Sequence, residues 1–257
     1  MMKAYYYIMF FIIGTIFGSF YNVVGSRIPK GESINKPGSH CEYCNHSLKW
    51  YELIPILSFI FLKGKCKNCH KKLSFFYPFS ELATGLLFLI SYHSFGFSLD
   101  LIISLTLVST FIIVIISDLT YLIIPDRFIV IPSIIVFIIT FIQKGLINSL
   151  IQIGYGIIAF IFMYLVMLLG NKLFKKESLG GADIKLMFLV GLTLDPMLSI
   201  VVIFLASFIA LPISLFLLLK NNEHIIPYGP FLMIGLLIVY FTKLSIIDIF
   251  NNVLKLF

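Results

Sequence analysis

Two aspartates lie at the edges of long apolar runs in this 257-residue chain. Asp118 ends one run in "VIISDLTYLIIPDRF", and Asp183 opens another in "SLGGADIKLM", directly after two glycines. Ionisable groups at or inside a membrane are costly, so they are functional candidates by default. Two carboxyl groups held close together cannot both ionise easily, so one keeps a proton while the other can deprotonate water. The pair therefore predicts an aspartic-protease type of site.

Each aspartate also has a simpler structural explanation. An aspartate before a helix is a good N-terminal cap, so Asp183 could be an ordinary cap and Asp118 a polar end to a membrane span. Asp126 differs from both because it follows Pro125, and a proline followed by an acid is typical of a helix N-terminus. We interpret Asp126 as structural.

The residues in front of Asp183 are small. Glycine lets a backbone bend sharply and lets an extended strand pass close to a neighbouring group. If the two aspartates form a site, Gly180, Gly181 and Ala182 are expected to form a loop along which a substrate approaches.

Four cysteines occur as two Cys-x-x-Cys pairs, in "HCEYCNHSLKW" and "GKCKNCHKKL": Cys41, Cys44, Cys66 and Cys69. Four thiolates suit a tetrahedral zinc ion, which can close a loop too small to fold on its own core. Disulfides are the alternative, but they should not persist on the reducing side of a membrane. The pattern predicts structural zinc. Nearby histidines could replace a ligand, although surface positions explain them more simply: His40, His46 and His70.

The composition is that of a membrane protein. Hydrophobic residues make up 60% of the chain, charged residues 12%, and the mean hydropathy is +1.03. Apolar runs near the ~20 residues of a membrane-crossing helix occur at 4–24, 80–97, 99–117, 128–142, 150–170, 186–194, 198–219 and 228–247. They favour an all-α polytopic membrane protein with about eight transmembrane helices. The run at 186–194 is short for a full crossing.

The first run could instead be a cleaved signal peptide, because Lys3 precedes it. Its apolar part is longer than a typical signal core, and no small-x-small cleavage site follows, so we expect a retained helix. The run also contains "GTIFG", Gly14 to Gly18, a small-xxx-small spacing that lets two helices approach closely.

Lysine and arginine are distributed unevenly over the expected loops. With the N-terminus outside and eight spans, fifteen basic residues fall inside and four outside. The positive-inside rule then places the loop at 25–79 and both aspartates at the cytoplasmic face, with the C-terminus outside. A basic face near anionic lipid headgroups explains the net charge of +7 without a nucleic-acid partner.

These features divide the chain into three expected parts. Residues 1–24 form the first transmembrane helix, residues 25–79 a cytoplasmic zinc-binding region, and residues 80–257 a multi-helix membrane domain. Trp50, Tyr51 and the segment "LIPILSF" lie between the cysteine pairs. They either pack on the zinc region or lie at the level of the lipid headgroups, where amphipathic rings are favoured.

The segments "GSFYNVVGSRIP", "KPGSHCEYCNHSLKWYELIPILSFIFLKGKCKNCHKKLSFFYPFSELATG", "SDLTYLIIPD" and "GGADIKL" follow one another as in a known family. In order and spacing, the chain resembles the type IV prepilin peptidases, which are bifunctional leader peptidases and N-methyltransferases. The resemblance covers nearly the whole chain and is closest to members that serve competence pseudopili in Gram-positive bacteria.

The resemblance implies a membrane-embedded aspartic endopeptidase of the cell membrane. It would remove the short basic leader of prepilins or pseudopilins, cutting after a glycine at the cytoplasmic face. The family's catalytic aspartates correspond to Asp118 and Asp183. Its second motif is often Gly-x-Gly-Asp, whereas Ala182 precedes the acid here. Alanine is small enough that the close approach of a substrate strand is expected to survive this departure. The family's four cysteines correspond to the two pairs described above.

The resemblance also implies transfer of a methyl group from S-adenosylmethionine to the new N-terminal amine. The sequence contains no glycine-rich nucleotide fingerprint, so it assigns no residue to the methyl donor. Glu52 and Glu81 flank the zinc-binding region and could hold the donor or a basic leader. Solvated or helix-end charges are the simpler interpretation of both.

Two other functional classes compete with this one. A transporter or channel could use acids at helix breaks to bind cations. It would be expected to have pore-facing polar residues within several spans and often an internal repeat, and we find neither in the sequence. A zinc-organised scaffold would explain the cysteines and leave both aspartates as unrelated caps. Processing of a prepilin would separate all three.

Overall fold

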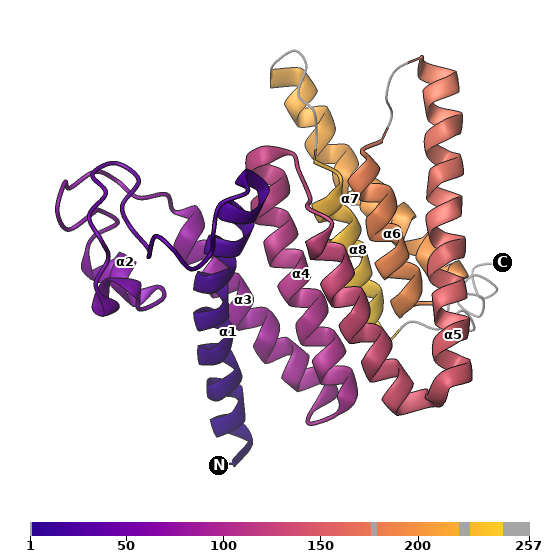
Figure 1. Ribbon diagram of the computed structural model, residues 1–257, viewed down its shortest axis with the longest axis horizontal. Helices are drawn as coiled ribbons and strands as arrows, with labels where there is room; N and C mark the ends of the chain where they lie inside the picture. Colours follow the sequence, from indigo (N-terminus) through magenta and orange to yellow (C-terminus); the bar gives the residue numbers. More distant parts are fainter. Residues whose placement is uncertain (1, 176–178, 221–226, 244–257) are drawn as a thin grey trace. The chain divides into compact units, whose positions relative to one another are not determined.

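The computed structural model describes residues 2–175, 179–220 and 227–243, and these residues are mainly helical (Figure 1). Among them the only β-type pairing is two isolated bridges near the cysteines, His40 with Ser47 and Lys65 with Lys72. The expected all-α class is confirmed for this part of the chain. The chain divides into two compact units, one of residues 1–101 and 108–121 and one of residues 102–107 and 122–257.

The first unit contains the N-terminal helices and the cysteine region. Helix α1 (Met2–Arg27) leads through a short 3-10 turn, η1 (Ile28–Lys30), into the loop region. A second 3-10 turn, η2 (Trp50–Leu53), and the short helix α2 (Leu57–Phe61) lie between the cysteine pairs. Helix α3 (Phe76–Phe95) and most of α4 (Leu99–Tyr121) complete the unit.

Glycine allows α1 and α3 to pack backbone against backbone. A Cβ atom on Gly14 would lie 2.8 Å from the Cα of Gly85, and one on Gly18 would lie 2.8 Å from the Cα of Glu81. Distances this short leave no room for a side chain, so the "GTIFG" spacing marks a real helix contact. Helix α1 also contacts α4, where the hydroxyl of Tyr21 in α1 lies 2.6 Å from the hydroxyl of Ser109 in α4.

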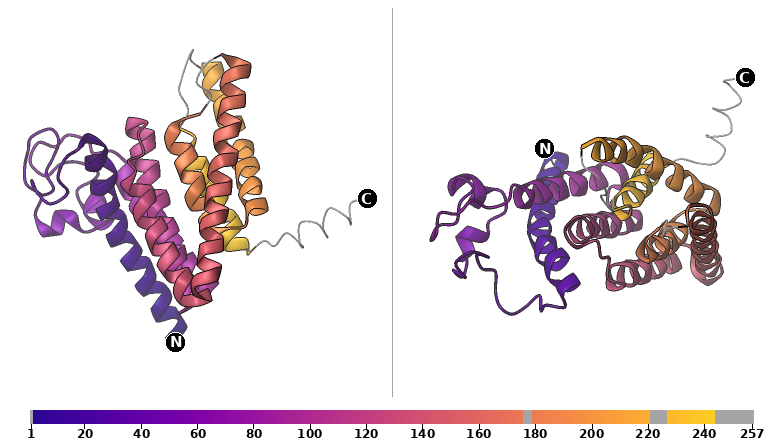
Figure 2. Two further views of the ribbon diagram at one scale, coloured as in Figure 1. Left: turned by 45° about the vertical axis from the view of Figure 1, so that its right-hand side comes forward. Right: turned by 90° about the horizontal axis from the view of Figure 1, so that it is seen from above.

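The second unit consists of α5 (Arg127–Phe174), α6 (Gly181–Thr193), α7 (Pro196–Lys220) and α8 (Gly229–Thr242). Helix α5 is broken at Gly145, whose φ of 78° and ψ of 175° are not helical. Glycine tolerates this conformation because it has no Cβ atom. The two arms of α5 fold back on each other at this point (Figures 1 and 2), and they contain the separate runs expected at 128–142 and 150–170.

Glycines also bring the helices of the second unit together. A Cβ atom on Gly191 of α6 would lie 2.9 Å from the Cα of Gly156 in the second arm of α5. One on Gly235 of α8 would lie 2.9 Å from the carbonyl oxygen of Val202 in α7. Figure 2 shows α6, in orange, beside the second arm of α5 in both views.

Each predicted apolar run coincides with helix apart from end residues at 96–97, 194, 228 and 243. The last four residues of the run at 228–247 lie outside the described residues, as does Lys255. Four helical segments of the described chain are long and apolar enough to cross a membrane: Ala4–Lys30, Leu99–Tyr121, Arg127–Phe174 and Pro196–Phe216. Helix α6 has 13 residues. At 1.5 Å per residue it rises about 20 Å, less than the ~30 Å hydrocarbon core.

Candidate functional site

The two cysteine pairs form two knuckles of the same construction. In the first, the amide of Cys41 donates to the carbonyl of His46, and the amide of Asn45 donates to the carbonyl of Cys41. In the second, Cys66, Lys71 and His70 make the equivalent bonds. The residue after each second cysteine has a positive φ, 53° at Asn45 and 56° at His70. This matched geometry points both pairs of sulfur atoms to one place.

The four sulfur atoms converge. The Sγ atoms of Cys41 and Cys69 are 3.9 Å apart, as are those of Cys44 and Cys66, and all four lie within 4.8 Å of one another. A disulfide needs about 2.05 Å. Zinc–sulfur bonds of about 2.3 Å at tetrahedral angles place the sulfur atoms about 3.8 Å apart. The donor set therefore fits a four-thiolate metal site such as zinc.

The protonation of these thiols also favours a bound cation. The backbone amides of Cys69 and Asn68 lower the pKa of the Cys66 thiol to about 6. At Cys69 the amide of Lys71 lowers the pKa, but desolvation and the neighbouring sulfur atoms outweigh it and raise the pKa to about 11. Four crowded thiols resist ionising together, and a divalent cation removes that conflict.

Glu52 connects the first knuckle to the segment that follows it. Its Oε2 accepts a hydrogen bond from the amide of Lys49 (2.9 Å) and lies 3.3 Å from Nε2 of His46. Burial raises the pKa of this carboxyl, but the Lys49 amide and His46 together lower it below its usual value. Among the described residues, no hydrogen-bond partner reaches its buried Oε1.

Glu81 lies near the start of α3, and its Oε2 accepts a hydrogen bond of 2.7 Å from the amide of Ile56. It therefore ties the segment between the knuckles to α3. Glu52 and Glu81 are 7% and 8% exposed. The alternative of a solvated charge is wrong for both, because each carboxylate is enclosed and bonded to a backbone amide. The helix-end alternative agrees with the structure, since Glu52 lies in the first turn of η2 and Glu81 near the start of α3.

Two polar residues beside Glu81 were not identified from the sequence. Ser80 of α3 donates a hydrogen bond of 2.8 Å to Oδ1 of Asn22 on α1, and both side chains are buried. The Nδ2 atom of Asn22 has no hydrogen-bond partner among the described residues. A serine directly before the glutamate in an apolar helix was the available signal.

The flanking histidines lie outside the cluster of sulfur atoms. His46 is directed to Glu52, while Nδ1 of His40 lies 2.9 Å from the carbonyl oxygen of Gly38. His70 is exposed. None of the three belongs to the metal-ligand group, which consists of the four cysteines alone within the described chain.

Asp118 belongs to the first unit and lies within α4, one turn before its end at Tyr121. The side chain is buried, with 6% of its surface exposed. The helix continues past it, so Asp118 does not simply end the span. A buried carboxylate at this position has a cost that an ordinary helix end does not.

Asp183 belongs to the second unit and is the third residue of α6. The N-cap is Gly180, with extended φ and ψ of −70° and 141°, so Asp183 does not cap the helix and is 7% exposed. Gly181 and Ala182 form the first helical turn instead of the loop expected from sequence. Only Gly180 of the three precedes the helix.

Asp126 is the N-cap residue of α5, as its position after Pro125 predicts. Its side chain does not cap the helix. It forms an exposed ion pair with Lys185 of α6, with Oδ1 and Nζ 2.6 Å apart. Asp126 thus links the starts of two helices in the second unit.

Comparison with known proteins covers both units. A model described as the bacterial peptidase A24 N-terminal domain matches residues 12–95, and one described as the type IV leader peptidase family matches residues 105–215. The chain is 33% identical to a prepilin leader peptidase/N-methyltransferase of Bacillus subtilis, over 93% of this chain and 96% of that protein. It is 30% identical to the protein of that name from Vibrio cholerae, over 94% and 98%.

No solved structure matches this chain. The family matches and the full-length relatives nevertheless agree with each other, and between them they include both cysteine pairs and both buried aspartates. This chain belongs to the type IV leader peptidase family.

Proposed function

We propose that this chain is a membrane-embedded aspartic endopeptidase that removes the short basic leader of type IV prepilins or pseudopilins, cutting after a glycine. The observation that carries the proposal is the match over 93% of the chain to the Bacillus subtilis prepilin leader peptidase/N-methyltransferase. Burial of a carboxylate in each of two helices, α4 and α6, supports an acid-based mechanism.

In this mechanism Asp118 and Asp183 act as a pair, one protonated and one ionised. The ionised carboxylate takes a proton from water, which attacks the carbonyl of the leader's last peptide bond. The protonated carboxyl gives its proton to that carbonyl oxygen, which forms a tetrahedral diol. As the C–N bond breaks, the other carboxyl passes the proton it took from water to the leaving amine, and the first takes back a proton from the diol. Because the two groups interact, their protons belong to the pair and titrate as coupled steps.

The start of α6 is where we place the approach of the substrate. A Cβ atom on Gly181 would meet nothing within 4 Å, so the surface there is open. Gly180, Gly181 and Ala182 together present backbone without bulky side chains next to the acid. An extended leader can lie close to such a surface.

The cysteine region, residues 25–79, holds one zinc ion through its four thiolates. Bound zinc supplies a structural cross-link between the two knuckles. The residues around it keep the loop folded: Glu52 ties the first knuckle to η2, and Glu81 ties the following segment to α3. Residues 1–24 then form the first membrane helix and residues 80–257 the peptidase domain.

The second activity is methylation of the new N-terminal amine with S-adenosylmethionine as donor. It is supported by the names of the relatives, which include N-methyltransferase. We assign no residue to the methyl donor.

The proposed orientation places the N-terminus outside the cell, and the cysteine region and the aspartates at the cytoplasmic face. Its support is the basic-residue count of fifteen inside against four outside.

The direct test incubates the purified protein with a membrane-anchored prepilin and looks for the shortened product by mass. A leader peptidase yields a product that begins after the leader's glycine. A channel or a zinc-organised scaffold leaves the prepilin intact.

A further inference from the structure

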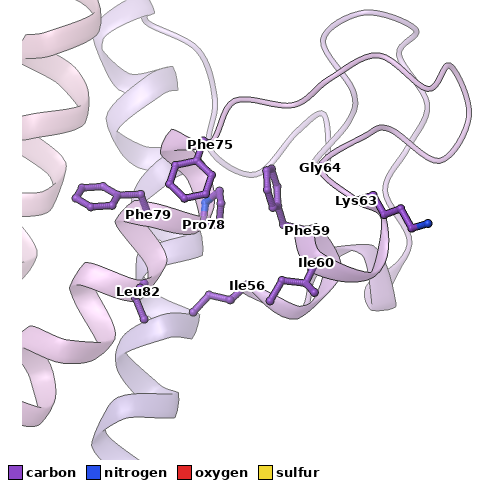
Figure 3. Close-up of a pocket in the computed structure, with 9 residues that line it drawn as sticks. All are labelled: Ile56, Phe59, Ile60, Lys63, Gly64, Phe75, Pro78, Phe79 and Leu82. Atoms are coloured by element: carbon purple, nitrogen blue, oxygen red, sulfur yellow. The ribbon is translucent and has the colours of Figure 1, made fainter.

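A groove lies between α2 and the start of α3, entirely within the first unit (Figure 3). Its volume is about 340 Å³. The walls are apolar, and the lining residues are Ile56, Phe59, Ile60, Lys63, Gly64, Phe75, Pro78, Phe79 and Leu82. Lys63 is the one charged residue among them. Figure 3 shows its ammonium at the outer edge, directed away from the apolar walls.

The groove is held in place from one side by an unusual turn. Ile56, the residue before α2, has a φ of 61°, a conformation that a β-branched residue rarely adopts. Its amide donates to the carboxylate of Glu81, which fixes the turn to α3. The short helix α2 therefore has a defined position against the first turns of α3.

The walls expose large apolar side chains. Phe75 is 71% exposed, Ile60 61% and Phe79 56%. Further apolar surface continues along α2 at Leu57 and Phe61. An apolar patch of this kind marks an interaction site, because such side chains gain free energy by leaving water.

The position of the groove indicates its surroundings. The start of α3 packs against the C-terminal half of α1, where Glu81 lies against Gly18 and Ser80 bonds to Asn22. Because α1 belongs to a segment long and apolar enough to cross a membrane, the groove lies beside the half of that segment that leads into the cysteine region. Amphipathic short segments with basic residues beside apolar ones bind at the boundary between acyl chains and headgroups.

We propose that this groove binds one acyl chain of an anionic phospholipid, with Lys63 at the lipid phosphate. A cavity of about 340 Å³ is at the lower end of the range for ligand pockets, about 300–1,000 Å³, and suits an alkyl chain better than a headgroup. The ammonium of Lys63, on an otherwise apolar rim, favours an anionic lipid headgroup over a zwitterionic one. The nearby acids Glu52 and Glu81 are buried and bonded internally, so they do not oppose it.

The test uses fluorescence quenching by brominated lipids. Trp50 is the only tryptophan of the chain, so Trp50→Phe gives a silent background. In that background Phe79→Trp places the probe on the groove wall. Ile90→Trp places a reference probe on an exposed position of the same helix outside the groove. Each full-length protein is reconstituted in phosphatidylcholine nanodiscs that contain either brominated phosphatidylglycerol or brominated phosphatidylcholine.

At position 79, brominated phosphatidylglycerol is expected to quench with about fivefold higher apparent affinity than brominated phosphatidylcholine, because one basic residue contributes that order of preference. Position 90 should show no preference. Lys63→Gln should remove the preference at position 79, whereas Lys63→Arg, and Lys36→Gln as a matched charge loss elsewhere in the loop, should keep it.

Equal quenching by both lipids at position 79, unchanged by Lys63→Gln, would mean ordinary contact with bulk lipid and would overturn the proposal. Absence of quenching by either lipid would mean that protein fills the groove, a second copy or a substrate helix, and would overturn it equally. Circular dichroism verifies that each variant is folded. None of these readouts involves prepilin cleavage, so the result is independent of the peptidase assignment.

Discussion

Gly180 lies beside the carboxylate of Asp183. Its φ of −70° is open to any amino acid, so backbone conformation does not require glycine here. The restriction is steric: a Cβ atom would lie 3.1 Å from Oδ2 of Asp183. The next position is different, because a Cβ atom on Gly181 would lie in open space and alanine favours the helix that begins there.

Gly180→Ala is therefore expected to lower prepilin cleavage severalfold, because the new Cβ atom displaces the carboxylate by a few tenths of an ångström and a displaced catalytic group costs up to about 10²-fold per ångström. Gly181→Ala leaves the carboxylate of Asp183 untouched but lies on the proposed substrate approach. The matched control is therefore Gly154→Ala in α5, where a Cβ atom also meets nothing within 4 Å and near wild-type activity is expected. The measurement is the initial rate of leader removal for the three purified variants. Wild-type rates for Gly180→Ala would show that the carboxylate tolerates the contact, and a loss only in Gly181→Ala would move the steric requirement to the substrate.

At this scale the sequence predicted residue types better than residue environments. The cysteines and Asp126 follow local rules, the Cys-x-x-Cys spacing and a proline before a helix start, and their local placement agrees. The burial of Glu52 and Glu81 depends on amides of Lys49 and Ile56 that no sequence pattern identifies. Whether Asp118 and Asp183 act together stays a prediction.

At the scale of the elements, the two knuckles are expected to depend on each other, because their four sulfur atoms lie at one site. Cys41→Ser combined with Cys44→Ser is expected to abolish zinc binding, because two of four ligands are lost. The loop should then become sensitive to protease while the helices keep their circular dichroism signal. His70→Asn is the control: His70 lies outside the ligand group, and asparagine tolerates its φ of 56°. Full zinc retention by the double cysteine variant would place the ligands elsewhere.

The contact between α1 and α3 depends on small residues. Gly14→Leu should destabilise the protein by about 1–3 kcal/mol, the usual cost of overpacking, because its Cβ atom alone would meet Gly85 at 2.8 Å. Gly154→Leu in α5 is the comparison, since nothing lies within 4 Å of a Cβ atom there. Unfolding of both variants in mixed detergent micelles measures the difference. Equal stability would contradict the close packing of α1 on α3.

The elements themselves were largely predictable, because uninterrupted apolar runs in a membrane protein form helices. The short helix α2 was not, since five residues carry too little periodicity to identify it. The start of α6 at Gly181 was not predictable either, because two consecutive glycines are more typical of a loop than of a helix start. Here the helix begins earlier than local preference indicates, and its close contact with Gly156 of α5 is made by Gly191, near its other end.

For the whole molecule, the orientation in the membrane is testable by labelling. The basic-residue count predicts that the loop at 25–79 is cytoplasmic and the region around Lys144 external. A thiol reagent that cannot cross membranes should label Lys144→Cys on intact cells and label Asn35→Cys only after permeabilisation. Both positions are exposed. Labelling of Asn35→Cys on intact cells would reverse the orientation.

The central claim is that Asp118 and Asp183 form the catalytic pair, and the most direct measurement is prepilin cleavage by three asparagine variants. Asp118→Asn and Asp183→Asn should each abolish leader removal while the proteins still insert into the membrane and retain zinc. Asp126→Asn should keep substantial activity, because its exposed pair with Lys185 is worth at most about 1 kcal/mol. Near wild-type cleavage by either of the first two variants would contradict the pair.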